Sequence, residues 1–321
     1  MAAIESPSAL IESLVAILGF PPVESVVLVT VQDGAMGCVM RLDLREAALD
    51  GAVQRLAELA VRNGADEVTA VIVSAEAARC PICGEQFRAM SRDLAEALAR
   101  RGARLGATLV VDRIAAGGRW HCVDNCGAAG VLNDPASSVL AAAAVVTGRR
   151  MYKDRGELEA SVAVDFEHAA ALAPLLDGVG GVVDCVAVCV REAVAAVRRM
   201  ATGEMLSDAE LAGVGAALAD VRVRDLLFTM VDSDVSAAAE ALWALLARTL
   251  RQPLRAEALT LLAFSAYLRG DGPLAGIALE AVLAENPHHR MAGLLDTALQ
   301  SGVRPDEIRG LLSGIPSAVT V

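Results

Sequence analysis

Two pairs of cysteines are the residues of this chain most suited to chemistry. Cys80 and Cys83 are separated by two residues and followed by Gly84, which is the pattern of a zinc knuckle. Two thiolates at this spacing can bind one ion, and the glycine permits a tight turn in which backbone amides point at sulfur. Cys122 and Cys126 form a looser second pair, with three residues between the sulfurs and again a glycine behind.

Taken together, Cys80, Cys83, Cys122 and Cys126 predict a structural zinc site. Four thiolates complete a tetrahedral shell and leave no open position, so such an ion would join two distant segments and its binding would contribute folding free energy. His121 is an alternative metal ligand. Because neighbouring strand residues point to opposite faces, however, His121 and Cys122 should not both bind the same ion.

A second interpretation makes Cys80 and Cys83 a redox pair. The pair follows a predicted strand and precedes a predicted helix, and a helix N-terminus stabilises a thiolate and lowers its pKa. Cys80 would then be the attacking thiolate and Cys83 the resolving thiol, as in thiol–disulfide oxidoreductases. This hypothesis leaves the pair Cys122 and Cys126 unexplained.

The three remaining cysteines are better explained as core residues than as ligands. Cys185 and Cys189 lie four apart in an apolar helical segment, and Cys38 lies on the inward face of a predicted strand. A free cysteine behaves as a small hydrophobe, so packing is favoured over a two-point metal site.

Other signs of catalysis are weak. The sequence contains no phosphate-binding P-loop and no nucleophile elbow, and its glycine-rich segment 177–182 lacks the setting of a dinucleotide fingerprint. A third hypothesis is a small-molecule enzyme with a pocket between two domains that uses Arg119, Trp120 or His121. The sequence therefore favours a non-enzymatic protein and leaves enzyme activity undecided.

The elements that would position the cysteines belong to a predicted α/β domain over residues 1–150. Strand patterns alternate with helical ones, which predicts a mixed sheet that is parallel where helical crossovers intervene. Strands are expected at 24–31, 38–44, 67–74, 107–114 and 119–124, and helices at 6–20, 45–64, 85–102 and 135–148.

Residues 151–321 predict an all-helical second domain, because the strand signal disappears there. Ser207 followed three positions later by Glu210 predicts a capping box at a helix start. Residues 257–287 show two amphipathic helices around a turn at offsets resembling a tetratricopeptide repeat (TPR), and an ordinary helical hairpin is the alternative. One repeat cannot bury its own face, so this TPR-like hairpin is expected to pack on preceding helices or on a partner protein.

Composition and charge limit the cellular setting and the partners. The chain has 321 residues, 55% of them hydrophobic, and a formal net charge of −12, which argues against general binding of nucleic acid or anionic lipid. No apolar run reaches the roughly 20 residues of a membrane span, and no secretory signal begins the chain. A cytoplasmic location is expected, where cysteines are reduced and paired spacings favour metal or redox chemistry. The sequence indicates no ligand and no oligomeric state.

Several blocks of sequence resemble an actinobacterial family known as domain of unknown function 4192 (DUF4192). They occur in the family's order, at residues 6–31, 117–126, 136–148, 218–227 and 259–287. The resemblance implies a cysteine cluster soon after the tryptophan strand, which corresponds to Cys122 and Cys126 near Trp120. The pair Cys80 and Cys83 is not a general mark of the family, so a site built from both pairs would belong to this member or a subgroup. The resemblance implies no activity.

The prediction that follows is an uncharacterised cytoplasmic protein, most simply a non-enzymatic binding or scaffold protein. An α/β domain in which a structural zinc ion joins two distant segments would be followed by a helical domain. The last hairpin of the helical domain would offer a surface to a protein partner. The thiol-based redox protein and the small-molecule enzyme remain open as alternatives.

Overall fold

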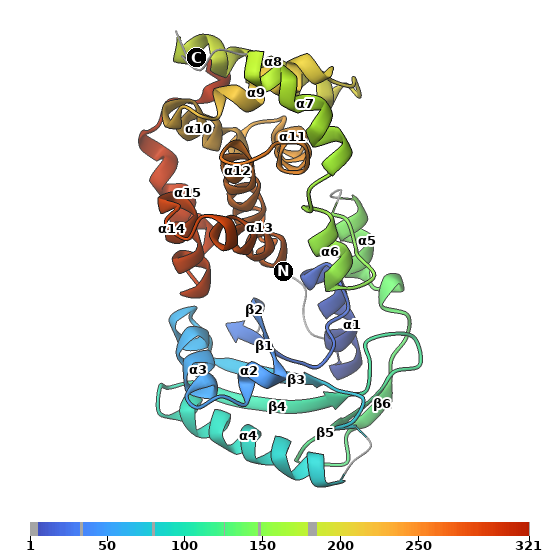
Figure 1. Cartoon of the computed structure of the whole chain (residues 1–321). Helices are drawn as coiled ribbons and strands as arrows, with labels where there is room; N and C mark the ends of the chain where they lie inside the picture. The colour runs from blue at the N-terminus through green and yellow to red at the C-terminus, as the bar shows by residue number, and fades with distance from the viewer. Residues whose placement is uncertain are drawn as a thin grey trace. The chain divides into compact units, whose positions relative to one another are not determined.

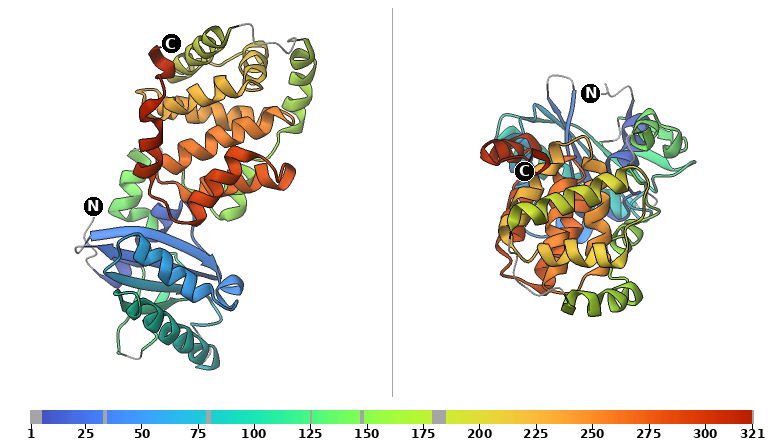
Figure 2. Two further views of the ribbon diagram at one scale, coloured as in Figure 1. Left: turned by 90° about the vertical axis from the view of Figure 1, so that its left-hand side faces the viewer. Right: turned by 90° about the horizontal axis from the view of Figure 1, so that it is seen from above.

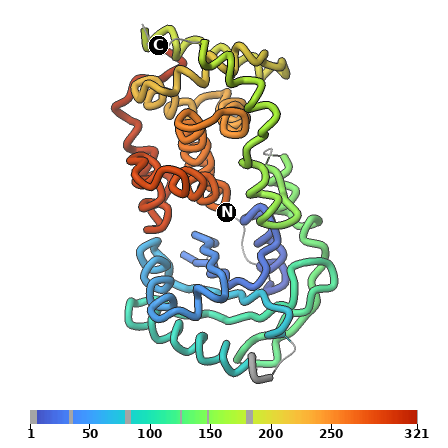
Figure 3. The backbone as a smooth tube through the Cα atoms, viewed as in Figure 1, coloured from blue at the N-terminus to red at the C-terminus, as the bar shows by residue number. Residues whose placement is uncertain are grey.

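The computed structural model describes residues 6–32, 35–78, 81–124, 126–146, 149–178 and 185–320, with backbone alone at residue 35 and at 81–83. The chain divides into two compact units, Met1–Glu157 and Leu158–Val321. The path of the backbone through each unit can be followed in Figure 3. None of the described helices combines the length and the apolar character that crossing a bilayer requires.

The first unit is built on a six-stranded mixed sheet (Figure 1). Its order is β2-β1-β3-β4-β5-β6, and β3 and β4 are the one parallel pair among the described strands. The predicted mixed sheet is therefore confirmed, with the parallel pairing where a helix connects two strands. The strands are β1 (Ser25–Gln32), β2 (Ala35–Asp43), β3 (Glu67–Val73), β4 (Arg104–Val111), β5 (Arg119–Cys122) and β6 (Ala129–Val131).

Helices accompany this sheet through the first unit. They are α1 (Pro7–Leu18), α2 (Leu44–Ala47), α3 (Ala52–Arg62), α4 (Pro81–Ala99), the 3-10 turn η1 (Pro135–Ser137) and α5 (Val139–Val146), and α6 (Arg155–Ala160) crosses the boundary between the two units. The single helix expected at 45–64 is wrong, because the chain turns between Ala47 and Ala52. Gly51 adopts a φ of 80° there, a left-handed conformation that glycine accepts without a steric penalty and that separates α2 from α3.

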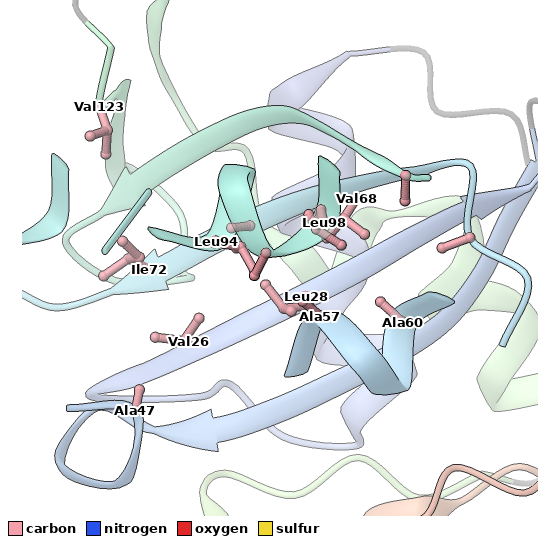
Figure 4. Packing of buried hydrophobic residues seen from close by; sticks show 14 of the residues in the cluster. Val26, Leu28, Ala47, Ala57, Ala60, Val68, Ile72, Leu94, Leu98 and Val123 are labelled. Atoms are coloured by element: carbon pink, nitrogen blue, oxygen red, sulfur yellow. The ribbon is translucent and has the colours of Figure 1, made fainter. Parts of the chain in front are cut away.

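Strands β1 and β3 are buried on both faces, which explains their nearly continuous apolar sequences. On one face Leu28 and Ile72 pack with Ala57 of α3 and Leu98 of α4, as Figure 4 shows. On the other face Val27, Val29 and Val71 pack with Leu10, Ile11 and Leu14 of α1. The alanines of α3 keep that helix close to the sheet, because a small side chain adds little to the distance between layers.

The tryptophan of β5 fixes the last two strands to α1. The Trp120 indole Nε1 donates a hydrogen bond of 2.8 Å to the Ser8 hydroxyl of α1. Its ring lies over Gly130 of β6, where an added Cβ would lie only 2.8 Å from the same nitrogen. The absence of a side chain at Gly130 is therefore required by the position of the ring.

Replacing Gly130 with alanine should destabilise the first unit. The new methyl group would push against an indole that is already held by a hydrogen bond, and such overpacking costs about 1–3 kcal/mol. Urea unfolding followed by circular dichroism measures the loss. Gly84→Ala is the matched control in α4, because an added Cβ there meets no atom closer than 3.9 Å. Equal midpoints for both variants would contradict this account of the ring.

The described residues of the second unit contain helices and no strand, which confirms the predicted all-helical region (Figure 2). Its α-helices are α7 (Phe166–Gly178), α8 (Val186–Ala201), α9 (Asp208–Ala217), α10 (Val221–Leu227), α11 (Ser236–Thr249), α12 (Leu254–Leu268), α13 (Gly272–Glu285), α14 (Arg290–Gln300) and α15 (Pro305–Gly310). Three 3-10 turns, η2 (Phe228–Asp232), η3 (Leu311–Gly314) and η4 (Ala318–Thr320), complete it.

The predicted capping box forms at the start of α9. The Ser207 hydroxyl accepts from the Glu210 amide, and the Glu210 carboxylate accepts from the Ser207 amide. Hydrogen bonds from Ser207, together with the neighbouring Arg199 guanidinium, lower the pKa of Glu210 to about 2. The carboxylate is therefore ionised at the helix N-terminus, where negative charge is favourable.

The predicted hairpin is made by α12 and α13 (Figure 1). Asp271 caps α13 by accepting from the Leu274 amide, and both small residues expected at the helix contact, Ala263 and Ala275, are buried. Helix α12 is buried along nearly all its length, so it is a core element of the unit. The relation to tetratricopeptide repeats stays a prediction.

A buried polar network joins α10, α12 and the start of α14. Glu257 of α12 binds Arg224 at 2.8 Å and His289 Nε2 at 3.2 Å. His289 Nδ1 accepts from the Ala292 amide, so its Nε2 carries the proton that reaches Glu257. Burial opposes the charge on Glu257, but the hydrogen bonds from His289 and Arg224 outweigh it and lower the pKa below the ordinary 4.5. The network should therefore hold Glu257 ionised.

Replacing Glu257 with glutamine should destabilise the second unit by about 1.5–3 kcal/mol, because it removes a charged hydrogen-bond partner of the buried Arg224, which keeps its ion pair with Asp225. The pKa of Glu257 is lower in the folded chain than in the unfolded chain, so its ionisation stabilises the fold at pH above about 4.5. This contribution is lost as the pH falls further. The wild-type chain should therefore lose stability in that range, and the variant should lose less. Urea unfolding from pH 3 to pH 7, at steps of about 0.5, tests both statements.

Glu307→Gln is the matched control for this experiment. Glu307 is exposed and pairs with Arg304 on the surface, where an ion pair contributes about 0–1 kcal/mol. A Glu257 variant as stable and as sensitive to acid as the Glu307 variant would refute the role given to the network.

Candidate functional site

The structure places the second predicted cysteine pair at the end of β5. Cys122 is the last residue of the strand and is 7% exposed, within the apolar cluster beneath α1. Cys126 is exposed in the turn that leads to β6. The prediction for Cys80 and for the side chain of Cys83 lies outside the described residues, although the backbone of Cys83 belongs to the first turn of α4.

The thiols of Cys122 and Cys126 influence each other, since their interaction raises the pKa of Cys122 and lowers the pKa of Cys126. The backbone at Asp124 lowers the pKa of Cys122, and the backbone at Ala128 lowers the pKa of Cys126. Gly127, directly behind Cys126, has a φ of 83°, the left-handed conformation that glycine readily adopts. The Cys122 amide also donates to the Ala128 carbonyl at 2.9 Å, so the chain turns back on itself around Cys126.

The two thiols differ in their readiness to ionise. Burial is the main cause that raises the pKa of Cys122, although the Asp124 amide opposes it. The pKa of Cys126 is lowered, first by the hydrogen bond from the Ala128 amide and then by the one from the Cys122 thiol. As the pH rises, Cys126 therefore loses its proton before Cys122 does.

Sequence reasoning identified the two cysteines but missed the residues that tune them. Asp124 and Ala128 act through their backbone amides, so no side-chain pattern marks them. The glycine behind Cys126 was the one available signal for this turn.

His121 lies between Trp120 and Cys122 in β5. Both neighbours belong to the apolar cluster beneath α1, so alternation along the strand directs the His121 side chain to the other side of the sheet. Its use as an alternative metal ligand stays a prediction. The use of Arg119, Trp120 or His121 in a pocket of an enzyme also stays a prediction. The Trp120 ring packs over Gly130, and its indole nitrogen is hydrogen-bonded to Ser8.

Helix α4 is attached to the segment that carries the second cysteine pair. Arg88 Nε donates to the Val123 carbonyl at 3.3 Å, one residue after Cys122. The Ser91 hydroxyl bonds the Thr108 hydroxyl of β4 at 2.8 Å. These contacts fix the N-terminal half of α4 on the strands that lead to the thiol turn.

The other cysteines do not gather at this site. Cys38 in β2 is half-buried, and burial raises its pKa. Cys189 in α8 is also half-buried with a raised pKa, mainly through burial. The core position predicted for Cys185 is wrong: it is exposed, because α8 begins only at Val186 and Cys185 is its N-cap residue.

In the part of the chain that the structure describes, no three or more histidine, cysteine or acidic side chains are grouped as metal ligands. Cys122 and Cys126 are two thiols, and a tetrahedral thiolate site would need four. A complete site would need further ligands from the residues that lie outside this description.

A six-stranded mixed sheet with helices, followed by an all-helical unit, defines a protein of the α+β class. The model of a family described as a domain of unknown function (DUF4192) matches residues 7–306, and the chain belongs to this family. No curated protein and no solved structure matches the chain. The family description states no activity, so a function has to be argued from the geometry of the chain itself.

Cys126 should react with iodoacetamide faster than Cys122 at neutral pH, by about tenfold or more, because it is exposed and its thiolate is stabilised. Peptide mass spectrometry after timed alkylation measures both rates in the same sample. Cys185 serves as an exposed reference thiol outside the turn. Equal rates at Cys122 and Cys126 would contradict the asymmetry described for this pair.

Proposed function

We propose that this chain is a non-enzymatic binding or scaffold protein whose first unit is held by a structural zinc ion. Cys80, Cys83, Cys122 and Cys126 would be its ligands. The observation that carries the proposal is the pairing of Cys122 and Cys126, whose thiols shift each other's pKa in opposite directions, in a turn closed by the bond from the Cys122 amide to the Ala128 carbonyl.

This arrangement suits a metal ion better than it suits two free thiols. Two thiolates close together repel each other, and a cation between them removes that repulsion. The amides of Asp124 and Ala128 would remain as outer donors to the bound sulfurs, which is how proteins commonly orient metal ligands. The left-handed Gly127 supports the same turn.

A zinc ion bound by both pairs would have a structural role. The described backbone places Cys83 in the first turn of α4, and Arg88 in the same helix already holds the carbonyl of Val123. An ion joining the two pairs would add a strong link beside the hydrogen bond between Arg88 and Val123. Four thiolates leave no open position on zinc, which argues for structure rather than catalysis.

The scaffold role is assigned to the helical unit, as the sequence suggested for its C-terminal hairpin. Because α12 is buried, a protein partner would meet α13 and α14 rather than both helices of the hairpin. Leu294 of α14 is among the exposed large apolar side chains and would suit such a contact.

A second candidate function is thiol–disulfide exchange. It was first suggested by Cys80 and Cys83, and it is favoured here by the unequal pKa values of Cys122 and Cys126. The Cys126 thiolate would attack a substrate disulfide and release one substrate thiolate, and Cys122, after giving up its proton, would attack the Cys126 sulfur of the mixed disulfide and release the second. The substrate gains two electrons and two protons, and the protein pair becomes a disulfide.

Metal analysis separates these functions. The zinc proposal predicts about one zinc per chain in protein purified without added metal or chelator. The ion should be lost in Cys126→Ser and in Cys83→Ser, because each removes one ligand. Cys189→Ser is the matched control, since Cys185 and Cys189 have the same spacing as Cys122 and Cys126 but lie in the second unit. Inductively coupled plasma mass spectrometry measures the content.

Each other outcome has a definite meaning. Metal-free protein with a reducible disulfide within either cysteine pair supports the redox function and rejects zinc. If zinc is retained in Cys83→Ser but lost in Cys126→Ser, the four-cysteine set is rejected. A metal site that uses Cys126 without Cys83 would then remain. Equal zinc in Cys126→Ser and Cys189→Ser rejects the site altogether.

A further inference from the structure

A groove of about 600 Å³ opens in the first unit, away from the cysteine turn in sequence. Its walls come from the residue before β1, the segment from α2 into α3, the turn after β3, and α4. Leu44, Val53, Phe87 and Met90 line it and also pack against the apolar core, so they form an apolar floor. The volume lies within the range of small-molecule sites in proteins, about 300–1,000 Å³.

The groove lies at the edge of the sheet where strands end. Strand β2 ends at Asp43 and β3 ends at Val73, and both residues pair with Ser25, where the antiparallel β1 begins. The segments that leave and enter these strands converge at this edge and supply the walls of the groove.

The charges around the groove favour a cation. Among the described residues that line it, four carry carboxylates, namely Glu24, Asp50, Glu76 and Asp93, and one carries a guanidinium, namely Arg45. This excess agrees in sign with the net charge of the whole chain. A positively charged ligand would be attracted, and an anion of the same shape would be repelled.

Glu24 is the residue of the groove with the most unusual backbone. Its φ of 43° lies in the left-handed region, and it is the one non-glycine residue with positive φ in the described ranges. Glutamate rarely adopts this conformation, and such residues gather at functional sites. The Glu24 carbonyl accepts from the Leu44 amide at 2.9 Å. Two segments are thereby joined beside the groove.

The Glu24 side chain is also held in place. Its Oε2 accepts from the Ser74 hydroxyl at 3.0 Å, directly after β3 ends. This bond engages one of the two carboxylate oxygens, and a carboxylate can accept further bonds at the other. A preorganised carboxylate beside an apolar floor can bind an ammonium group without first losing side-chain freedom.

We propose that this groove binds a small organic cation, namely an amine that carries an apolar body. The apolar part would lie on Leu44, Val53, Phe87 and Met90, and the ammonium would face Glu24 and Asp93. The proposal does not depend on the zinc site, because it uses neither of the cysteine pairs.

The test uses three probes of one shape and different charge: 2-phenylethylamine, 2-phenylethanol and 3-phenylpropanoate. Titration of the isotope-labelled full chain, followed by amide chemical shifts in NMR, gives the affinity and location of each. The amine should bind with a Kd of about 5 mM or less and about fivefold more tightly than the alcohol. The anion should bind more weakly than the alcohol.

Variants then test the assigned residues. Glu24→Gln should weaken the amine about fivefold and leave the alcohol unchanged, because only the charge is removed. Glu58→Gln is the matched control, an exposed glutamate of α3 that does not line the groove. Leu49→Ser should weaken both ligands, since Leu49 lines the groove and is 65% exposed, so its loss spares the core.

Three results would overturn the proposal: no shift near the groove at about 20 mM amine, equal affinities for amine and alcohol, or equal losses in Glu24→Gln and Glu58→Gln. If Glu24→Gln does not fold, Asp93→Asn replaces it, because Asp93 is exposed on α4 and lines the same groove. An unchanged amine affinity in that variant would likewise reject the assigned carboxylates.

Discussion

Burial of β1 and β3 on both faces constrains everything else in the first unit. Their side chains pack against α3 and α4 on one side and α1 on the other, so these strands offer no surface to a ligand. Several groups of the candidate sites therefore lie where strands end. Cys122 closes β5, Glu24 precedes β1, and Ser74 follows β3. Asp93 is contributed by α4, outside the two buried faces.

The two sites depend on the backbone in similar ways. At the cysteine turn, amides of Asp124 and Ala128 stabilise charge on sulfur, and Gly127 gives the turn its conformation. At the groove, Glu24 accepts an unfavourable backbone conformation while Ser74 holds its carboxylate. In both places the fold fixes a group that could carry negative charge, and each site would be completed by a cation.

Periodicity predicted most of the architecture, and the failures have specific causes. Continuous apolar runs identified β1 and β3 because both strands are buried on two faces. The break between α2 and α3 was missed because helical spacing continues across Gly51, although its backbone is left-handed. Strand β6 has three residues, too few to show alternation. Cys185 looked like a core residue because apolar content does not show where a helix begins.

The candidate sites were less predictable than the fold. Spacing alone identified Cys122 and Cys126, but their unequal pKa values arise from burial and backbone amides that no residue pattern encodes. The groove was not predicted at all. Its lining residues come from segments between Glu24 and Asp93 that meet only after the sheet forms, and Glu24 is marked by a dihedral angle rather than by its residue type.

The shortness of β6 has a consequence for the behaviour of the protein at high concentration. An open sheet presents unpaired amides and carbonyls at its border, and a long, flat border can recruit a strand from another molecule. The border at β2 has nine residues, whereas the border at β6 has three, one of them a glycine beneath the Trp120 ring. So short a row of peptide groups offers little to a foreign strand. The border beside the exposed Cys126 is therefore the less receptive of the two.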